Sequence, residues 1–189
     1  LHQAGIIDNK PDTIEDEGNA TDRGPLFCSG CPHRPVFDIL KKRKVTVIGD
    51  IGCYSMGLLY PFEVLKTNIS MGASLGILKG MRRVYDMDDN REEPLVAVIG
   101  DGTFFHSGMP GFANLRHQLD PDSNMTIIVL DNGATAMTGG QPNGSSGKPG
   151  LADKSLGDMT IDIEELLTSM GFERVQRVDQ FEYKKTKEI

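Results

Sequence analysis

Two polar turns with metal-binding side chains follow apolar runs about 30 residues apart in the sequence. Asp101 stands between two glycines directly after the run 95–99, and Asn132 follows the run 125–130. Carboxylate and amide oxygens are ligands that Mg²⁺ accepts, and this ion usually completes its shell with water and phosphate oxygens. Glycines beside the carboxylate would let the backbone approach a diphosphate closely. The pair therefore indicates a site for Mg²⁺ and a diphosphate, although either turn alone would be an ordinary Gly-Asp or Asn-Gly turn.

Three cysteines and two histidines offer a second kind of chemistry. Cys28 and Cys31 form a Cys-x-x-Cys pair, and Cys53 lies in a later turn. In a reducing compartment such a pair indicates metal or redox chemistry, and the alternative is a set of buried thiols that shape a loop. A zinc site with His33 is less favoured because the sequence Cys-Pro-His is cramped. His33 and His106 lie next to the polar turns, where each could act as an acid–base group or serve as a structural hydrogen-bonding residue.

The elements that would position these residues alternate along the chain. Apolar runs at 45–48, 95–99 and 125–130 predict strands, and 172–178 could form a last strand. Helical spacing predicts helices over 36–40, 70–84, 106–119 and 161–170. The fold class is therefore α/β, with a parallel sheet covered by helices on both faces. Ligands bind at the carboxyl ends of such strands, so the turns at 49–50, 100–102 and 131–133 should meet at one edge.

Composition and patterning limit the remaining possibilities. The 189 residues carry 20 basic and 27 acidic side chains, a net charge of −7 that argues against nucleic-acid binding. No apolar run is long enough for a membrane span, and we expect no signal peptide. Residues 1–24 read as a polar linker or arm, 25–189 as the domain, and 133–150 as a loop rich in Gly, Pro and Ser. The charged, uncapped end at 182–189 and the initial Leu1 favour a fragment of a longer chain.

Several longer motifs make the assignment more specific. They are Cys28-Ser29-Gly30-Cys31-Pro32-His33-Arg34, Gly49-Asp50-Ile51-Gly52-Cys53-Tyr54, Met71-Gly72-Ala73-Ser74, Thr103-Phe104-Phe105-His106-Ser107-Gly108 and Thr135-Ala136-Met137-Thr138-Gly139-Gly140-Gln141-Pro142. With the turns at 100–102 and 131–132, this set resembles the thiamine diphosphate-binding domain of the 2-oxoacid:ferredoxin oxidoreductases, in particular their indolepyruvate branch. The resemblance covers about residues 25–180.

The resemblance implies a cofactor site with named residues. Mg²⁺ would be bound by the side chains of Asp101 and Asn132 and by the backbone carbonyl of Ala134. Thiamine diphosphate contacts are implied at Asp50, Gly52, Cys53, Met71, Gly72, Gly100, Asp101, Gly102, Thr103, Asn132, Ala134, Thr135 and Met137. Cys28, Cys31 and Cys53 match cluster ligands of the pyruvate and 2-oxoglutarate relatives, although a [4Fe–4S] cluster usually needs four thiolates.

The implied activity is the oxidative decarboxylation of an aryl 2-oxoacid, with electrons passed to ferredoxin and the acyl group to coenzyme A. The implied partners are a pyrimidine-binding domain of the same or another subunit and a beta subunit, in the cytoplasm. Nothing in the sequence resembles that pyrimidine-binding domain, so this segment alone should not turn over. The alternatives are another thiamine diphosphate enzyme, such as pyruvate:ferredoxin oxidoreductase or a 2-oxoacid decarboxylase, and a non-catalytic cofactor-binding or redox module.

Overall fold

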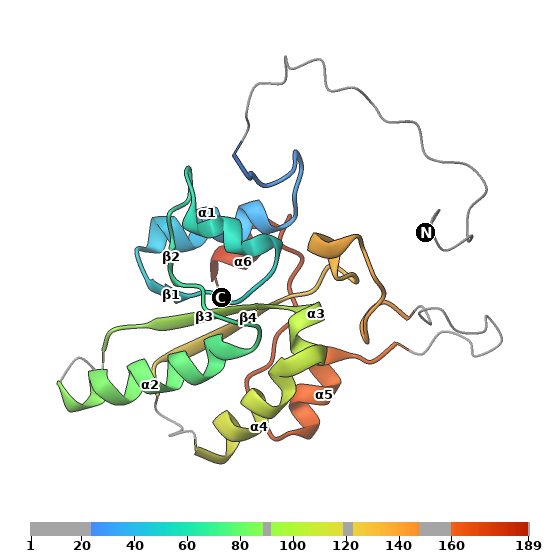
Figure 1. Ribbon diagram of the computed structural model, residues 1–189. Helices are drawn as coiled ribbons and strands as arrows, with labels where there is room; N and C mark the ends of the chain where they lie inside the picture. Colours follow the sequence, from blue (N-terminus) through green and yellow to red (C-terminus); the bar gives the residue numbers. More distant parts are fainter. Residues whose placement is uncertain (1–23, 89–91, 119–122, 148–159, 189) are drawn as a thin grey trace, which may run out of the picture.

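A four-stranded parallel sheet forms the centre of the computed structural model, which describes residues 24–88, 92–118, 123–147 and 160–188 (Figure 1). The strands are β1 (Thr46–Ile48), β2 (Leu65–Thr67), β3 (Leu95–Gly100) and β4 (Met125–Leu130), in the order β2-β1-β3-β4. The three strands predicted from apolar runs are therefore confirmed, and all pairings are parallel. The arm predicted over residues 1–24 lies outside the described residues except for Gly24.

The predicted strand at 172–178 is wrong. The segment runs without strand pairing, and its polar residues could not be buried on both faces of a parallel sheet. It is held instead by side chains: the Phe172 ring packs edge-on against Phe112 at 5.8 Å, and Arg177 donates to the Asp162 carboxylate at 2.6 and 2.7 Å. The sequence analysis missed β2, because three residues with Lys66 in the middle give no apolar run.

The helices are close to those predicted, with shifted ends. They are α1 (His33–Arg43), α2 (Ala73–Met87), α3 (Asp101–Thr103), the π-helical η2 (Phe104–Gly108), α4 (Met109–Gln118), α5 (Ile163–Ser169) and α6 (Tyr183–Glu188), with 3₁₀ segments η1 (Cys53–Leu58) and η3 (Ala136–Thr138). α1 begins before the predicted 36–40 because Pro35 lies in its first turn, where proline is tolerated. The predicted helix at 106–119 is the end of a helical run that begins at Asp101, directly after β3. Among the helices in the described ranges, none is long and apolar enough to cross a membrane.

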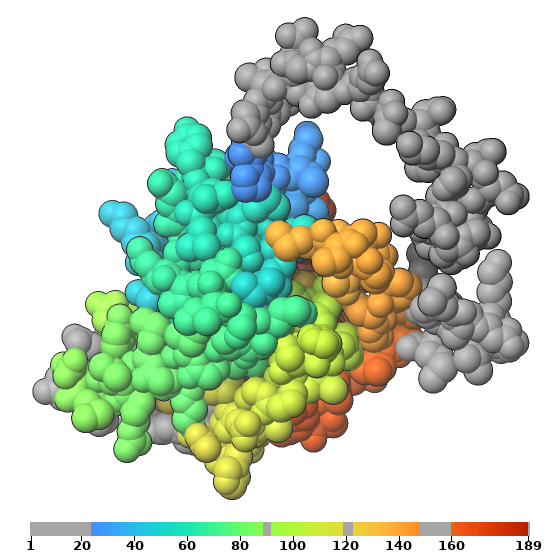
Figure 2. All heavy atoms as spheres, in the orientation of Figure 1, coloured from blue at the N-terminus to red at the C-terminus, as the bar shows by residue number. Residues whose placement is uncertain are grey.

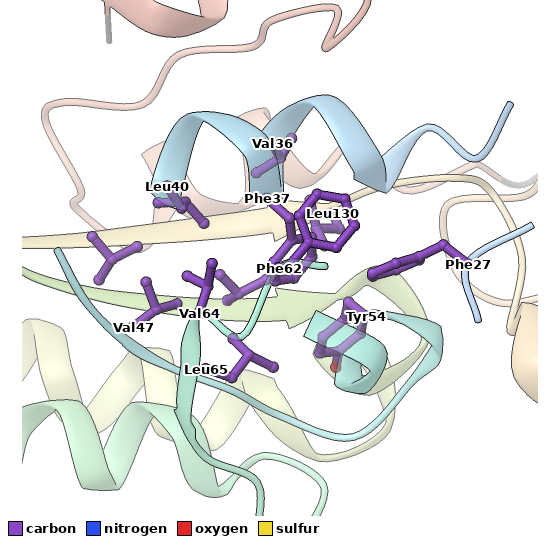
Figure 3. Close-up of a cluster of buried hydrophobic side chains, with 12 residues drawn as sticks. Phe27, Val36, Phe37, Leu40, Val47, Tyr54, Phe62, Val64, Leu65 and Leu130 are labelled. Atoms are coloured by element: carbon purple, nitrogen blue, oxygen red, sulfur yellow. The ribbon is translucent and has the colours of Figure 1, made fainter. Parts of the chain in front are cut away.

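The two faces of β3 carry two separate cores, which confirms the α/β fold class. Val96 and Val98 lie on the face that packs against α1, in the cluster drawn in Figure 3, which also includes Leu65 of β2. Leu95, Ala97 and Ile99 face the opposite way, toward α2, α4 and α5. All six residues of β3 are buried, as a parallel strand covered on both faces requires. In Figure 1, α1 and α6 accordingly lie on one side of the sheet and α2, α4 and α5 on the other.

Candidate functional site

The polar turns lie at the carboxyl edge of the sheet, as predicted. The register of β3 and β4 pairs Gly100 with Leu130, so that Asp101 and Asp131 follow the two strands at the same level. Asp101 is buried, with 3% of its surface exposed, whereas Asn132 is exposed. The register of two neighbouring parallel strands therefore places the carboxylate beside the Asp-Asn-Gly turn.

The three residues implied as Mg²⁺ ligands come together around one backbone amide. The N–H of Ala134 donates to Asp101 Oδ2 at 3.0 Å and to Asn132 Oδ1 at 3.1 Å. A carboxylate oxygen and an amide oxygen thus lie next to each other, with the carbonyl of Ala134 in the same turn. Three hard oxygens of this kind suit Mg²⁺, which takes its remaining ligands from water and a phosphate. The residues present therefore fit a Mg²⁺-diphosphate group.

The glycines around Asp101 allow neighbouring loops to approach its backbone. A Cβ atom at Gly102 would lie 2.7 Å from Thr135 Oγ1, and one at Gly100 would lie 2.7 Å from Tyr54 Cε1. Any side chain at either position would push apart the segments that form the site. Gly100, Gly102 and Thr135, all implied as cofactor contacts, are thus brought together at the start of α3.

Tyr54 joins the turn after β1 to the turn after β3, a role that the sequence analysis missed. Its hydroxyl donates to the carbonyl of Ile51 at 2.8 Å, and the Thr103 hydroxyl donates to the same carbonyl at 3.0 Å. Burial raises the pKa of Tyr54 to about 12, opposed by its hydrogen bond with Thr103. The signal that could have found it is its place as the last residue of the motif at 49–54, directly after Cys53.

Asp50 is fully buried and is bonded to backbone amides. Its Oδ1 accepts from Ile51 N–H at 2.8 Å and from Gly72 N–H at 2.9 Å, and its Oδ2 accepts from Ser74 N–H at 3.1 Å. The carboxylate thereby holds the first turn of α2 against the end of β1. Gly72 has a φ of +82°, which favours glycine, while Met71 is 40% exposed beside it.

The two candidate histidines lie in different surroundings. His33 is buried, edge-on to the rings of Phe27 and Tyr54 with centroid distances of 6.4 and 6.3 Å. Burial lowers the pKa of His33, and the nearby charge of Asp101 opposes this shift, so His33 lies within electrostatic range of the site. His106 is exposed on η2. A catalytic role for either histidine stays a prediction.

The three cysteines are free thiols that lie near one another. Cys28 is exposed, and Cys31 and Cys53 are half-buried. Cys31 N–H donates to the carbonyl of Cys28 at 3.2 Å, closing a turn in which Gly30 has a φ of +71°. Burial raises the pKa of Cys53, with further contributions from Cys31 and Cys28. Across residues 24–88, 92–118, 123–147 and 160–188, no three His, Cys, Asp or Glu side chains are grouped to hold a metal ion, so the structure shows no ready zinc or cluster site.

A further segment borders Asp101 that the sequence analysis treated only as a loop. Ser145 Oγ lies 3.2 Å from Asp101 Oδ2, and the loop is fixed at Gly144, whose carbonyl accepts from Ile161 N–H at 2.8 Å. In Figure 2 this stretch, in orange, stands on the surface next to the yellow-green start of the α3 run. The Gly-Ser repetition of residues 144–147 gave no sign of this contact. Met137, also implied as a contact, lies 53% exposed in η3 of the same stretch, and residues 148–150 lie outside the described residues.

Comparison with protein families identifies the class of domain that this fold and site define. Residues 50–189 match the family described as thiamine pyrophosphate enzyme, C-terminal TPP binding domain. Because this match covers well over half of the chain, the chain belongs to that family.

Curated relatives narrow the similarity further. The chain is 37% identical over 179 residues to the indolepyruvate oxidoreductase subunit IorA of Thermococcus kodakarensis, with 88% of this chain and 26% of the relative covered. It is 38% identical over 178 residues to IorA of Pyrococcus horikoshii and of Pyrococcus abyssi, with the same coverage of each chain. The chain thus spans about a quarter of the length of the curated relatives that it matches.

Proposed function

We propose that this chain is the thiamine diphosphate- and Mg²⁺-binding domain of an indolepyruvate-type oxidoreductase. The observation that carries the proposal is the convergence of Asp101 and Asn132 on the amide of Ala134, at the carboxyl edge of a parallel sheet. Membership of the thiamine pyrophosphate family supports the cofactor, and similarity to IorA subunits supports the substrate class. The names of these relatives favour an indolepyruvate-type oxidoreductase over pyruvate:ferredoxin oxidoreductase or a 2-oxoacid decarboxylase.

In this proposal the chain's own residues bind and orient the cofactor. Asp101, Asn132 and the carbonyl of Ala134 would hold Mg²⁺, and Gly102 would leave room for the diphosphate. Thiamine diphosphate supplies the carbanion chemistry of decarboxylation when it is bound, and the protein supplies position and electrostatic field. The side chains of His33 and Tyr54 are buried against each other within electrostatic range of Asp101, and they would keep water away from that part of the site.

The proposal extends to the reaction of the whole enzyme. A longer protein containing this segment would oxidatively decarboxylate an aryl 2-oxoacid, transfer the acyl group to coenzyme A and pass the electrons to ferredoxin. A pyrimidine-binding domain and a beta subunit would complete the site, and the enzyme would act in the cytoplasm. The cluster implied at Cys28, Cys31 and Cys53 stays a prediction, because the described residues hold no group of three His, Cys, Asp or Glu side chains placed to bind a metal ion; iron and sulfide analysis of the anaerobically purified enzyme would decide it.

Calorimetric titration of the full-length parent protein with thiamine diphosphate, with and without Mg²⁺, tests the proposal. We expect Mg²⁺-dependent binding that Asp101→Ala and Asn132→Ala each weaken, the former by about 100-fold or more because a buried charge is lost. Asn114→Ala is the matched control, since Asn114 is an exposed amide side chain on α4. A folded wild-type protein that binds no thiamine diphosphate would contradict the cofactor assignment and favour a non-catalytic module.

A further inference from the structure

The hydroxyl of Ser145 faces the oxygen of Asp101 that lies among the candidate Mg²⁺ ligands. Ser145 Oγ lies 3.2 Å from Asp101 Oδ2, which also accepts from Ala134 N–H at 3.0 Å. The same N–H donates to Asn132 Oδ1 at 3.1 Å. The other carboxylate oxygen, Asp101 Oδ1, accepts from the backbone N–H of Gly102 at 2.7 Å. Ser145 Oγ is therefore next to the carboxylate oxygen that would bind the cation, and not next to the one that holds the backbone.

The hydroxyl of Ser145 has one proton and two neighbouring acceptors. Ser145 Oγ lies 2.8 Å from Asn143 Oδ1, a usual length for an O–H···O hydrogen bond, whereas the 3.2 Å to Asp101 Oδ2 is longer than the usual range. Asn143 Oδ1 also accepts from the backbone N–H of Ser145 at 2.9 Å, so it is the oxygen of the amide and cannot donate. The hydroxyl proton therefore points to Asn143, and lone pairs of Ser145 Oγ face the carboxylate.

The contact between Ser145 Oγ and Asp101 Oδ2 has the spacing of two metal ligands. Facing lone pairs repel each other, and a cation bound by both oxygens turns that repulsion into attraction. Two neighbouring oxygens of an octahedral Mg²⁺ stand about 3 Å apart, because each lies about 2.1 Å from the ion. The observed 3.2 Å is close to that separation. A serine or threonine hydroxyl is also a known kind of Mg²⁺ ligand beside a phosphate, as in the P-loop.

The candidate ligand set leaves a position for this oxygen. Asp101, Asn132 and the carbonyl of Ala134 would supply three oxygens, and a chelating diphosphate supplies two, one from each phosphoryl group. Mg²⁺ takes six ligands in octahedral geometry, so one position remains for water or for a further protein oxygen. Ser145 is half-buried beside this set, which places a protein hydroxyl where that last ligand is needed.

The loop that carries Ser145 is held in place by contacts that do not involve Asp101. The carbonyl of Gly144 accepts from Ile161 N–H at 2.8 Å. A Cβ atom at Gly144 would lie 2.7 Å from the ring of Phe105, so the backbone of the loop is packed against that ring. The position of the Ser145 hydroxyl beside the carboxylate is therefore fixed from the far side of the loop, as a preformed ligand requires.

We propose that Ser145 Oγ is a fourth protein ligand of the Mg²⁺ held at Asp101, with its proton donated to Asn143. The inference rests on the proposed function, because it needs a cation at that carboxylate. The competing account is a purely structural serine that only holds the loop beside Asp101. In that account, exchanging the hydroxyl oxygen for sulfur would not change which metal ion the site prefers.

Ser145→Cys tests direct contact with the cation, because thiolate sulfur prefers soft metal ions and Mg²⁺ prefers oxygen. In the full-length parent protein, calorimetry measures the affinity for thiamine diphosphate at saturating Mg²⁺ and at saturating Cd²⁺. We expect Ser145→Cys to weaken binding by about 10-fold or more with Mg²⁺ and to keep or exceed the wild-type affinity with Cd²⁺. Ser145→Ala leaves the position to water and should weaken binding by about 10-fold with either ion.

The controls separate the cation at Asp101 from other thiol chemistry. Cys28, Cys31 and Cys53 are free thiols that also attract Cd²⁺, so the readout is the affinity for thiamine diphosphate and not that for the metal. Ser169→Cys adds a thiol at an exposed serine of α5 and should keep the wild-type ratio of the two affinities.

The ratio of the affinity with Cd²⁺ to the affinity with Mg²⁺ decides the inference. A ratio in Ser145→Cys that exceeds the wild-type ratio by about 10-fold or more would support a direct ligand. An unchanged ratio in Ser145→Cys, together with loss of binding in Asp101→Ala, would overturn this inference and leave the proposed function standing. Absence of Mg²⁺-dependent binding in the folded wild type would overturn both.

Discussion

Replacing Asp50 with asparagine should destabilise the start of α2 while leaving cofactor binding close to that of the wild type. The carboxylate of Asp50 is fully buried and accepts three backbone N–H groups, two of them from the first turn of α2. The asparagine has the same shape, and its oxygen can still accept from Ile51 and Gly72. Its NH₂ group, however, must then face the N–H of Ser74, so that two donors oppose each other.

The size of the effect can be worked from these contacts. Leaving the N–H of Ser74 without an acceptor costs about 1–3 kcal/mol. Loss of the negative charge also weakens the two remaining bonds, because charge-assisted hydrogen bonds are roughly twice as strong as neutral ones. Together we expect about 2–4 kcal/mol of local destabilisation, which corresponds to about 30- to 700-fold faster hydrogen exchange of the amides at 72–74.

Hydrogen exchange followed by mass spectrometry on the full-length protein measures this loss segment by segment. Calorimetry with thiamine diphosphate and Mg²⁺ measures binding in the same preparation. Asp101→Asn is the matched comparison, since it should show the reverse pattern of weak binding and an unchanged start of α2. If Asp50→Asn abolished binding while the exchange of the α2 amides stayed at the wild-type rate, Asp50 would be a cofactor contact and the positioning argument would be refuted.

Three further predictions concern the stability of the fold. Burial raises the pKa of Tyr54 to about 12 from an ordinary value of 10. The stability that the neutral phenol contributes is therefore complete below pH 10 and is lost as the pH rises toward 12. Denaturant melts at a series of pH values should show a shallower loss of stability over that range in Tyr54→Phe than in the wild type, and equal slopes would contradict this expectation. Gly57→Ala would bring a Cβ atom to 2.7 Å from Cδ1 of the fully buried Phe37, so we expect the melting temperature to fall with about 1–3 kcal/mol of destabilisation. Gly76→Ala, where no atom lies within 4 Å of the new Cβ in the exposed face of α2, should instead stabilise the protein by up to about 1 kcal/mol; matching shifts in the two variants would argue against the packing account.

The strands and the edge at which they end could be predicted from the sequence because a strand covered on both faces needs an uninterrupted apolar run. β3 is the clearest case, since all six of its residues are buried. β2 gave no such signal, because its three residues gain their place by pairing with β1 rather than from their own hydrophobicity. The strand prediction at 172–178 was wrong because apolar side chains there do not signal a strand. Phe172 and Val175 pack against the core as single side chains, without the backbone joining the sheet.

The sequence predicted the part of the candidate site in which residue type and spacing along the chain indicate metal binding. Asp101 and Asn132 are a carboxylate and an amide at the ends of neighbouring strands, and the strand register then brings them together. Ser145 could not be found in this way, because its contact with Asp101 depends on how the loop that carries it folds back toward the carboxylate. The sequence predicted that the glycines beside Asp101 leave room for a diphosphate. It did not predict that Gly100 and Gly102 also make room for Tyr54 and Thr135 of this chain.

Asp101 has two roles in this arrangement, and they can be separated. Its Oδ1 accepts from Gly102 N–H at 2.7 Å and its Oδ2 from Ala134 N–H, so the same carboxylate that would bind Mg²⁺ also ties the loop after β4 to the start of α3. Asp101→Ala removes the ligand and the tie together, and a loss of binding in that variant alone could come from a displaced loop. Asp101→Asn keeps an oxygen acceptor but lacks the charge. If the carboxylate acts mainly through the cation, Asp101→Asn should lose Mg²⁺-dependent binding almost as fully as Asp101→Ala while keeping more of the hydrogen-exchange protection of the amides at 133–135, whereas equal losses of that protection would assign the carboxylate chiefly to the loop.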